Sequence, residues 1–169
     1  MESYGWKNRR TKNHDTNNQI ETSVNRIVFI LHYEDVKEDN VNRLMSECQG
    51  QSFLIKVQSY NNWKDVIKQI LSCEYVVSTS LHGLILADAY GVPNQWITLQ
   101  NRSDFKYKDY YSSVGKKAIS IRITDDTRIE ELLEKMKMYE PIVFDPKPLL
   151  RACPFPIINP AIISIMKTD

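Results

Sequence analysis

Short apolar runs alternate along most of the chain with longer segments that have the periodicity of amphipathic helices. The first run, RIVFIL at residues 26–31, is nearly continuous, as in a strand buried on both faces of a parallel sheet. Further strand-like runs cover residues 52–57, 75–78, 95–99 and 118–121. Helix-like segments cover residues 36–48, 63–71, 81–90, 105–114 and 127–138. The alternation predicts a Rossmann-like, three-layer α/β domain with a mostly parallel sheet of five or six strands.

Two segments fall outside this alternation and set the expected domain limits. Residues 1–24 are polar and are expected to form a disordered leader, so the α/β domain is placed at residues 25–140. Residues 141–169 form the expected C-terminal tail. Six of the seven prolines follow residue 140, and residues 141–160 therefore predict an irregular or short-helical stretch. Because this tail is also rich in apolar side chains, we expect it to pack on the domain or on a partner, such as a second copy of the chain.

Charge and composition exclude several classes of protein. The chain has 22 Lys and Arg against 21 Asp and Glu, a balance that gives no general attraction to nucleic acid. No apolar run approaches the length of a transmembrane helix, and the N-terminus lacks the apolar core of a signal peptide. The three cysteines form no CxxC pair, which fits a reducing compartment. These features predict a cytoplasmic protein without a metal site.

Familiar glycine-rich and catalytic motifs are absent from the sequence. It contains no GxGxxG, Walker A, HExxH or GxSxG pattern. Dinucleotide binding by a glycine-rich loop and P-loop chemistry are therefore excluded.

One strand–turn–helix segment has the features of an anion site. The hydroxyl-rich turn at residues 78–80 follows a predicted parallel strand, at the edge where open α/β sheets bind ligands. Ser80 can cap the following helix, and His82 and Gly83 fall in its first turn, where free N–H groups favour an anion. Gly83 would let a ligand or the protein's own backbone approach closely. From spacing alone, a capped helix whose histidine has no chemical role is the plainer interpretation.

The same segment resembles the signature of the polysaccharide pyruvyltransferase family. In that family a strand leads into Ser-x-(Arg/Ser)-Leu-His-(Gly/Ala/Ser), an apolar helix and Gly-(Val/Ile)-Pro, and residues 76–97 read VVSTSLHGLILADAYGVPNQWI. ILHYED at residues 30–35 resembles the family's Pro-His-Tyr-x-Asp element, and DFKYKDYY at residues 104–111 its lysine-bearing segment. LLRACPF at residues 149–155 fits family tails. Two departures are Ser80, where some members have Arg, and Leu31, where Pro is common.

The resemblance implies a fold, a reaction and a set of residues. It implies the C-terminal, donor-side half of a GT-B-like architecture. The reaction would transfer pyruvate from phosphoenolpyruvate to a sugar as a ketal, in exopolysaccharide or cell-surface glycan biosynthesis, without a cofactor. It implies His82 as the catalytic residue. The residues implied in donor binding are His32, Ser78, Ser80, Leu81, Gly83, Arg102 and Lys106.

Family members have a preceding half of comparable size, whereas 25 residues precede the first predicted strand here. We therefore expect the chain to be inactive without a complementing N-terminal half. Two alternatives stay open: a GT-B glycosyltransferase donor domain that binds a nucleotide-sugar, and a truncated, non-catalytic remnant. Among the remaining residues, Trp63 and Trp96 are expected in the core, and Asp88 on the surface or at a helix cap.

Overall fold

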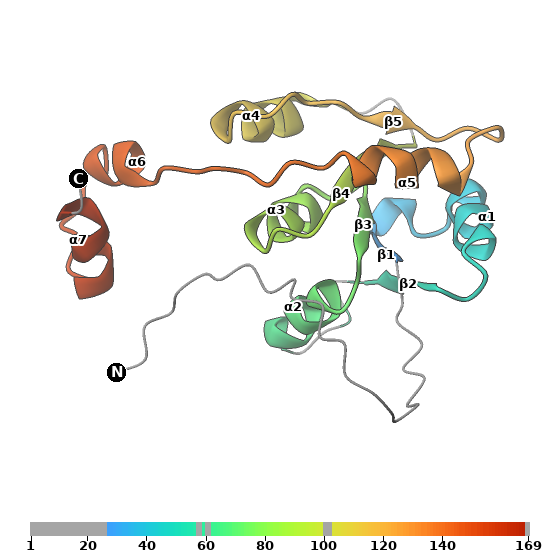
Figure 1. Cartoon of the computed structure of the whole chain (residues 1–169), viewed down its shortest axis with the longest axis horizontal. Helices are drawn as coiled ribbons and strands as arrows, with labels where there is room; N and C mark the ends of the chain where they lie inside the picture. Colours follow the sequence, from blue (N-terminus) through green and yellow to red (C-terminus); the bar gives the residue numbers. More distant parts are fainter. Residues whose placement is uncertain (1–26, 57–58, 60–61, 100–102, 168–169) are drawn as a thin grey trace, which may run out of the picture.

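The computed structural model describes residues 27–56, 59, 62–99 and 103–167, and it contains one five-stranded sheet (Figure 1). The expected leader at residues 1–24 and the candidate site residue Arg102 lie outside the described residues. The strands are β1 (Ile27–Ile30), β2 (Ser52–Ile55), β3 (Tyr75–Ser78), β4 (Asn94–Thr98) and β5 (Ile121–Arg122). Every pairing is parallel, and the order is β2-β1-β3-β4-β5. The predicted parallel sheet is confirmed.

Helices cover both faces of the sheet. They are α1 (Asp39–Glu47), α2 (Trp63–Leu71), α3 (Leu81–Ala89), α4 (Phe105–Ser113) and α5 (Ile129–Lys137), with a 3-10 turn η1 (Tyr33–Asp35) before α1. Figure 1 shows α2, α3 and α4 on one side of the strands, with α3 in the middle, and α1 and α5 on the other side. This arrangement confirms the predicted three-layer architecture.

Alternate side chains of the central strand β1 build two separate cores. Ile27 and Phe29 pack with α1 and α5, whereas Val28 and Ile30 pack with α2 and α3. All four residues of β1 are buried, because successive side chains of a strand point to opposite faces. A third cluster, in which the Trp96 and Tyr107 rings stack with centroids 4.4 Å apart, joins α4 to β4 and α3.

The last strand lies slightly later than its predicted position at residues 118–121. Ile121 and Arg122 pair with Ile97 and Thr98, whereas the carbonyl of Ile119 accepts a hydrogen bond from the Gln95 side chain. The Gln95 side-chain amide therefore takes the place of the backbone-to-backbone hydrogen bond expected here between β4 and β5. Backbone pairing of the two strands begins only at Ile121.

The two tryptophans expected in the core differ in their environments. Trp96 is buried, as predicted, but the prediction for Trp63 was wrong because 68% of its surface is exposed. Val66 and Ile70 lie on the same helical face as Trp63 and are buried. Trp63 is the first residue of α2, at the end of the helix layer, and the helical pattern does not reveal where that layer ends.

The tail contains two short helices, α6 (Lys147–Arg151) and α7 (Pro160–Lys167). α6 lies within the stretch predicted to be irregular or short-helical, and α7 follows that stretch. The two helices contact each other, and no residue of 141–167 is fully buried. Figure 1 shows both helices away from the sheet. Their packing on the domain or on a partner stays a prediction. None of the helices in the described ranges combines the length and apolar character that crossing a bilayer requires.

Candidate functional site

The strand order places a reversal of the chain path between β1 and β3. From β1 the chain passes to β2 on one side, and from β3 it passes to β4 on the other. In open α/β sheets, ligands bind at the carboxyl ends of the strands beside such a reversal. His32 follows β1 at this edge, and the turn at residues 78–80 follows β3.

Thr79 holds three elements together at the reversal. Its buried hydroxyl oxygen accepts a hydrogen bond from the backbone N–H of His32 at 2.9 Å, which fixes the chain that leaves β1. Its carbonyl accepts a hydrogen bond from the Tyr107 hydroxyl at 2.6 Å, which fixes α4. Sequence reasoning included Thr79 in the turn but gave it no role, because a hydroxyl that bonds distant backbone has no local sequence signal.

Two of the predicted binding residues, Ser78 and Gly83, determine the shape of the turn from its buried side. The buried Ser78 hydroxyl donates to the Ile30 carbonyl at 2.6 Å and accepts from the Ser80 N–H at 3.0 Å. A Cβ atom at Gly83 would lie 2.6 Å from Ser78 Oγ and 2.9 Å from Ile30 side-chain atoms. Gly83 therefore permits close approach of α3 to the strands, and both residues position the site from within the protein.

The first turn of α3 is open toward solvent. Ser80 occupies the predicted N-cap position, but its side chain makes no capping hydrogen bond. Leu81 is half-buried against the Trp96 cluster. His82 is exposed in the first turn, as predicted, and its ring makes no hydrogen bond within the described part of the chain. The uncapped N–H groups and the helix dipole make this end of α3 attractive to an anion.

Lys106 and His32 lie at the same edge. Lys106 is exposed in the first turn of α4, with its Nζ 5.2 Å from the centroid of the Tyr107 ring, and Tyr107 is the residue that bonds Thr79. The half-buried His32 ring lies 4.4 Å from the ring of Tyr33, centroid to centroid. Its Nδ1 atom is 3.6 Å from a carboxylate oxygen of Glu34. Thr79 is thus bonded by His32 itself and by Tyr107, the residue next to Lys106.

Lys108, two residues beyond Lys106, has a different environment. Its Nζ lies 2.6 Å from the Asp104 carboxylate, and this hydrogen bond lowers the pKa of Asp104. Lys108 is therefore a paired surface lysine on the same helix as Lys106.

Asp35 is a further acidic residue at this edge that sequence reasoning did not select. It is buried at the end of η1, where it lines a cavity of about 40 Å³ together with Thr79, Trp96 and Tyr107. The cavity can hold one or two water molecules. Asp35 belongs to the ILHYED segment, but an acidic residue in a predicted loop is ordinarily exposed, so its burial gave no signal.

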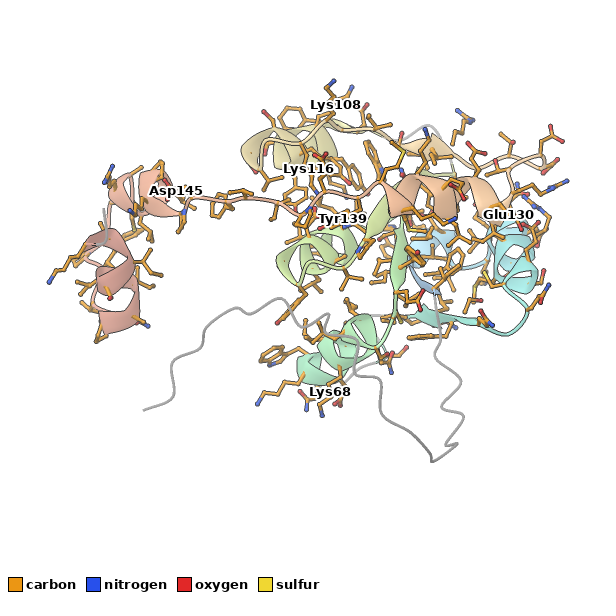
Figure 2. The ribbon with its side chains drawn as sticks, viewed as in Figure 1. Lys68, Lys108, Lys116, Glu130, Tyr139 and Asp145 are labelled. Atoms are coloured by element: carbon orange, nitrogen blue, oxygen red, sulfur yellow. The ribbon has the colours of Figure 1, made fainter. Side chains whose placement is uncertain are left out.

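A buried polar cluster occupies the opposite edge, where β4 begins. The Asp88 carboxylate accepts hydrogen bonds from Asn94, Tyr110, Lys116 and Tyr139, at distances of 2.8 to 2.9 Å. Two of these donors, Lys116 and Tyr139, are labelled in Figure 2, where they lie next to each other. The expectation that Asp88 is a surface or capping residue was wrong, because its side chain has no exposed area. Burial and the Asp88 carboxylate raise the pKa of Tyr110 and of Tyr139, so both hydroxyls stay protonated donors.

A hollow lies near this cluster and away from the reversal. It has a volume of about 620 Å³ and is lined by residues including Tyr75, Pro93 and Tyr139. Tyr75 begins β3 and Pro93 precedes β4, so the hollow lies at the amino edge. We assign the candidate site to the carboxyl edge because the chain reversal and the open end of α3 coincide there.

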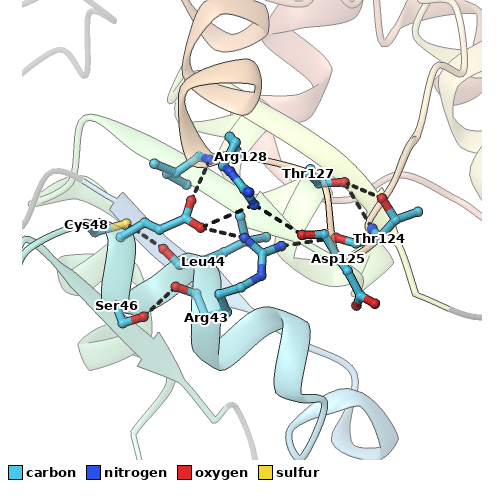
Figure 3. Close-up of polar contacts among 10 residues, drawn as sticks. Arg43, Leu44, Ser46, Cys48, Thr124, Asp125, Thr127 and Arg128 are labelled. Carbon is cyan, nitrogen blue, oxygen red and sulfur yellow. Dashed lines mark hydrogen bonds and ion pairs between the residues drawn. The ribbon is translucent and has the colours of Figure 1, made fainter.

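A second polar cluster joins α1 to α5 (Figure 3). The Glu47 carboxylate accepts a hydrogen bond from the Ile129 N–H at 3.0 Å and so caps the start of α5. It also pairs with Arg43 at 2.5 Å, and Arg43 donates to the Thr124 carbonyl at 3.0 Å. The cluster therefore fixes the loop after β5 to the last turn of α1.

A comparison with known protein families finds a match that covers the turn at residues 78–80. The family model described as polysaccharide pyruvyl transferase matches residues 2–101, more than half of the chain. The match includes most of the segment that we expected to be a leader.

Two curated relatives also match, and no solved structure does. Uncharacterized protein L143 of Acanthamoeba polyphaga mimivirus is 36% identical over 91 residues, which are 52% of this chain and 31% of that protein. The succinoglycan biosynthesis protein ExoV of Rhizobium meliloti (strain 1021) is 34% identical over 77 residues, which are 45% of this chain and 24% of that protein. The matched part spans less than a third of either relative.

Proposed function

The chain belongs to the polysaccharide pyruvyl transferase family, and on that premise we propose that its carboxyl edge binds phosphoenolpyruvate for pyruvyl transfer to a sugar. The observation that carries the proposal is the exposed His82 in the uncapped first turn of α3, beside the chain reversal. ExoV, whose name places it in succinoglycan biosynthesis, supports a glycan as the acceptor. The GT-B-like, donor-side assignment of this half is part of the proposal.

The proposed reaction needs anion binding and proton transfer. Protonation of the terminal carbon of phosphoenolpyruvate gives oxocarbenium character to the carbon that carries the phosphate. One sugar hydroxyl attacks that carbon, phosphate leaves, and a second hydroxyl of the same sugar closes the cyclic ketal as both hydroxyl protons are lost. The first-turn N–H groups of α3 and the Lys106 ammonium would bind the donor's phosphate and carboxylate. His82 would bind the same anion or deliver the proton.

We propose that these 169 residues bind the donor but need further chain for turnover. The matched part covers 31% and 24% of the two relatives, and catalysis requires both substrates to be held in register. The acid or base that serves the acceptor hydroxyls would come from that further chain. We place the reaction in the cytoplasm, where the free thiols of Cys48, Cys73 and Cys153 would stay reduced.

Isothermal titration of the chain with phosphoenolpyruvate tests the proposal. We expect His82→Ala and Lys106→Ala each to lower the affinity by about tenfold, the loss that removal of one charge-assisted contact produces. Lys108→Ala is the matched control, because Lys108 lies on the same helix and is already paired with Asp104. Binding of a UDP-sugar in place of phosphoenolpyruvate would favour the glycosyltransferase alternative, and equal phosphoenolpyruvate affinity of all three variants would reject the site.

A further inference from the structure

One buried tyrosine on α4 contacts two parts of the proposed donor site. The Tyr107 hydroxyl donates a hydrogen bond to the Thr79 carbonyl at 2.6 Å, and Thr79 belongs to the turn that leads into α3. The ammonium group of Lys106 lies over the same aromatic ring, with Nζ 5.2 Å from the ring centroid. Tyr107 therefore connects the start of α3 to the lysine that we propose to bind the donor.

The position of the Tyr107 ring is fixed by the core. The residue is only 8% exposed, and its ring stacks on the Trp96 ring of β4 with an angle of 9° between the ring planes. Leu81, the first residue of α3, packs against the same cluster. A ring packed in this way has little freedom to move. Its contacts with Thr79 and Lys106 therefore start from a fixed point on the sheet.

A donor with two anionic groups needs two binding elements that keep a constant separation. Phosphoenolpyruvate carries a phosphate and a carboxylate, and the proposed partners are the first-turn N–H groups of α3 and the Lys106 ammonium. An anion with one charged group can be bound by either element alone. A fixed side chain that contacts both elements favours the ligand that uses both at once, because the second contact then costs little further ordering.

We propose that Tyr107 is a positioning residue that makes the donor site selective for anions with two charged groups. Its hydroxyl holds the start of α3, through Thr79, in a constant relation to the helix that carries Lys106. This inference rests on the proposed function for the identity of the donor. It adds a determinant of selectivity that lies outside residues 2–101, the part of the chain that the family model matches.

NMR titrations, which also detect millimolar binding, test the inference with phosphoenolpyruvate, inorganic phosphate and pyruvate. The parent chain should bind phosphoenolpyruvate more tightly than either anion with one charged group. Tyr107→Phe keeps the ring and removes the hydroxyl. We expect it to weaken phosphoenolpyruvate binding about fivefold, the usual effect of one hydrogen bond. The affinities for phosphate and pyruvate should change by less than about twofold, because each needs one element only.

A double-variant cycle with Lys106 separates positioning from a general structural effect. Lys106→Ala removes one of the two elements, so phosphoenolpyruvate then binds as an anion held at one point. Tyr107→Phe should therefore lose most of its effect on phosphoenolpyruvate affinity in the Lys106→Ala background. A general structural effect would weaken binding by the same factor in both backgrounds.

Tyr111→Phe is the matched control. Tyr111 lies one turn further along α4, is 6% exposed and packs in the same cluster, with its ring centroid 6.1 Å from that of Trp96. Its hydroxyl makes no hydrogen bond to the turn at residues 78–80, which lies wholly within the described residues. Tyr111→Phe should keep the parent affinities for all three probes. Thermal melts of every variant check the fold.

Several outcomes would overturn the role of Tyr107 and leave the proposed function standing. These are parent-like phosphoenolpyruvate affinity of Tyr107→Phe, an equal loss for all three probes, or an undiminished loss in the Lys106→Ala background. Equal affinity of the parent chain for phosphoenolpyruvate and for phosphate would also overturn it, because there would be no selectivity to explain. A parent chain that does not bind phosphoenolpyruvate rejects the proposed function, and the role of Tyr107 with it.

Discussion

The ammonium group of Lys116 lies 2.8 Å from the Asp88 carboxylate, which is completely buried in α3. The same ammonium lies 4.1 Å from the centroid of the Tyr139 ring, and the Tyr139 hydroxyl donates to Asp88. One carboxylate therefore connects α3 to the segments that follow α4 and α5. Removal of one partner from such a pair leaves an uncompensated charge in the interior.

Asp88→Ala should lower the free energy of unfolding by about 3 kcal/mol, because Lys116 and two tyrosines lose their acceptor together. The measurement is urea denaturation followed by tryptophan fluorescence. Asp65→Ala is the control, because Asp65 pairs with Lys68 at 3.5 Å on the surface and should change stability by only about 0.5 kcal/mol. Similar values for the two variants would show that the buried cluster adds little to stability.

Gly83→Ala should destabilise the chain although alanine favours helices. The added Cβ would lie 2.6 Å from Ser78 Oγ and 2.9 Å from Ile30, and we expect a loss of about 2 kcal/mol from this overpacking. A double variant with Ser78→Ala removes the shorter contact. It should therefore lose less than the sum of the two single variants, as determined by a thermodynamic cycle. If the losses in unfolding free energy are additive, contact between the new Cβ and Ser78 is not the cause of the destabilisation.

Stability should fall in alkaline solution because of the Asp88 cluster. Burial and Asp88 raise the pKa of Tyr139 above its ordinary value of 10.0, so the folded state favours the protonated hydroxyl. This stabilisation is fully present below pH 10.0, the unfolded-state value, and is lost as the pH rises toward the higher folded-state pKa. Tyr139→Phe should therefore flatten the decline in urea midpoint between about pH 9 and pH 11.

The exposed Tyr33 is the control residue for this measurement. Tyr33→Phe should keep the pH profile of the parent chain. If Tyr139→Phe declines as steeply as the parent chain, ionisation of Tyr139 is not the cause.

Glu47→Ala should destabilise the start of α5 more than its end. Loss of the acceptor for the Ile129 N–H should cost about 1 kcal/mol, as is usual when a helix cap is removed. Hydrogen exchange should become faster at Ile129 and Glu130, while Met136 stays protected. Glu47→Gln keeps an acceptor and should lose less. Glu134→Ala removes an exposed pair with Lys137 and is the control. Uniform acceleration along α5 would contradict a capping role.

Apolar periodicity predicted the fold well because it reports burial directly. Continuous burial of β1 and the helical spacing of Val66 and Ile70 both follow from contact with a sheet. The same reasoning failed at Trp63, because periodicity assigns a face of a helix and says nothing about where the supporting layer ends. It also missed the hydrogen bond from the Gln95 side chain to the Ile119 carbonyl, which stands where a bond between two strand backbones was expected. Such a bond does not change the pattern of apolar residues.

The candidate site was predicted in part. The location of His82 followed from the turn and the helix start, which are local features of the sequence. The roles of Thr79 and Asp35 depend on contacts with Tyr107, Trp96 and the chain after β1. These partners are distant in sequence, and their meeting depends on the strand order. Asp88 was misplaced for the same reason, because its four donors come from β4, from α4 and from the segments that follow α4 and α5.

The turn between β3 and α3 is already fixed before any ligand arrives. The Ser78 hydroxyl donates a hydrogen bond to the Ile30 carbonyl, and the Thr79 hydroxyl accepts one from the backbone of His32; both fix the backbone of the turn. The absence of a side chain at Gly83 lets α3 pack closely against the strands. Ordering such a loop would otherwise cost about 1 kcal/mol of conformational entropy per residue, so a ligand at the proposed site would not have to meet that cost. His82 is exposed on this rigid support and makes none of the bonds that hold the turn. Its side chain can therefore be replaced during evolution while the strand-to-helix connection persists.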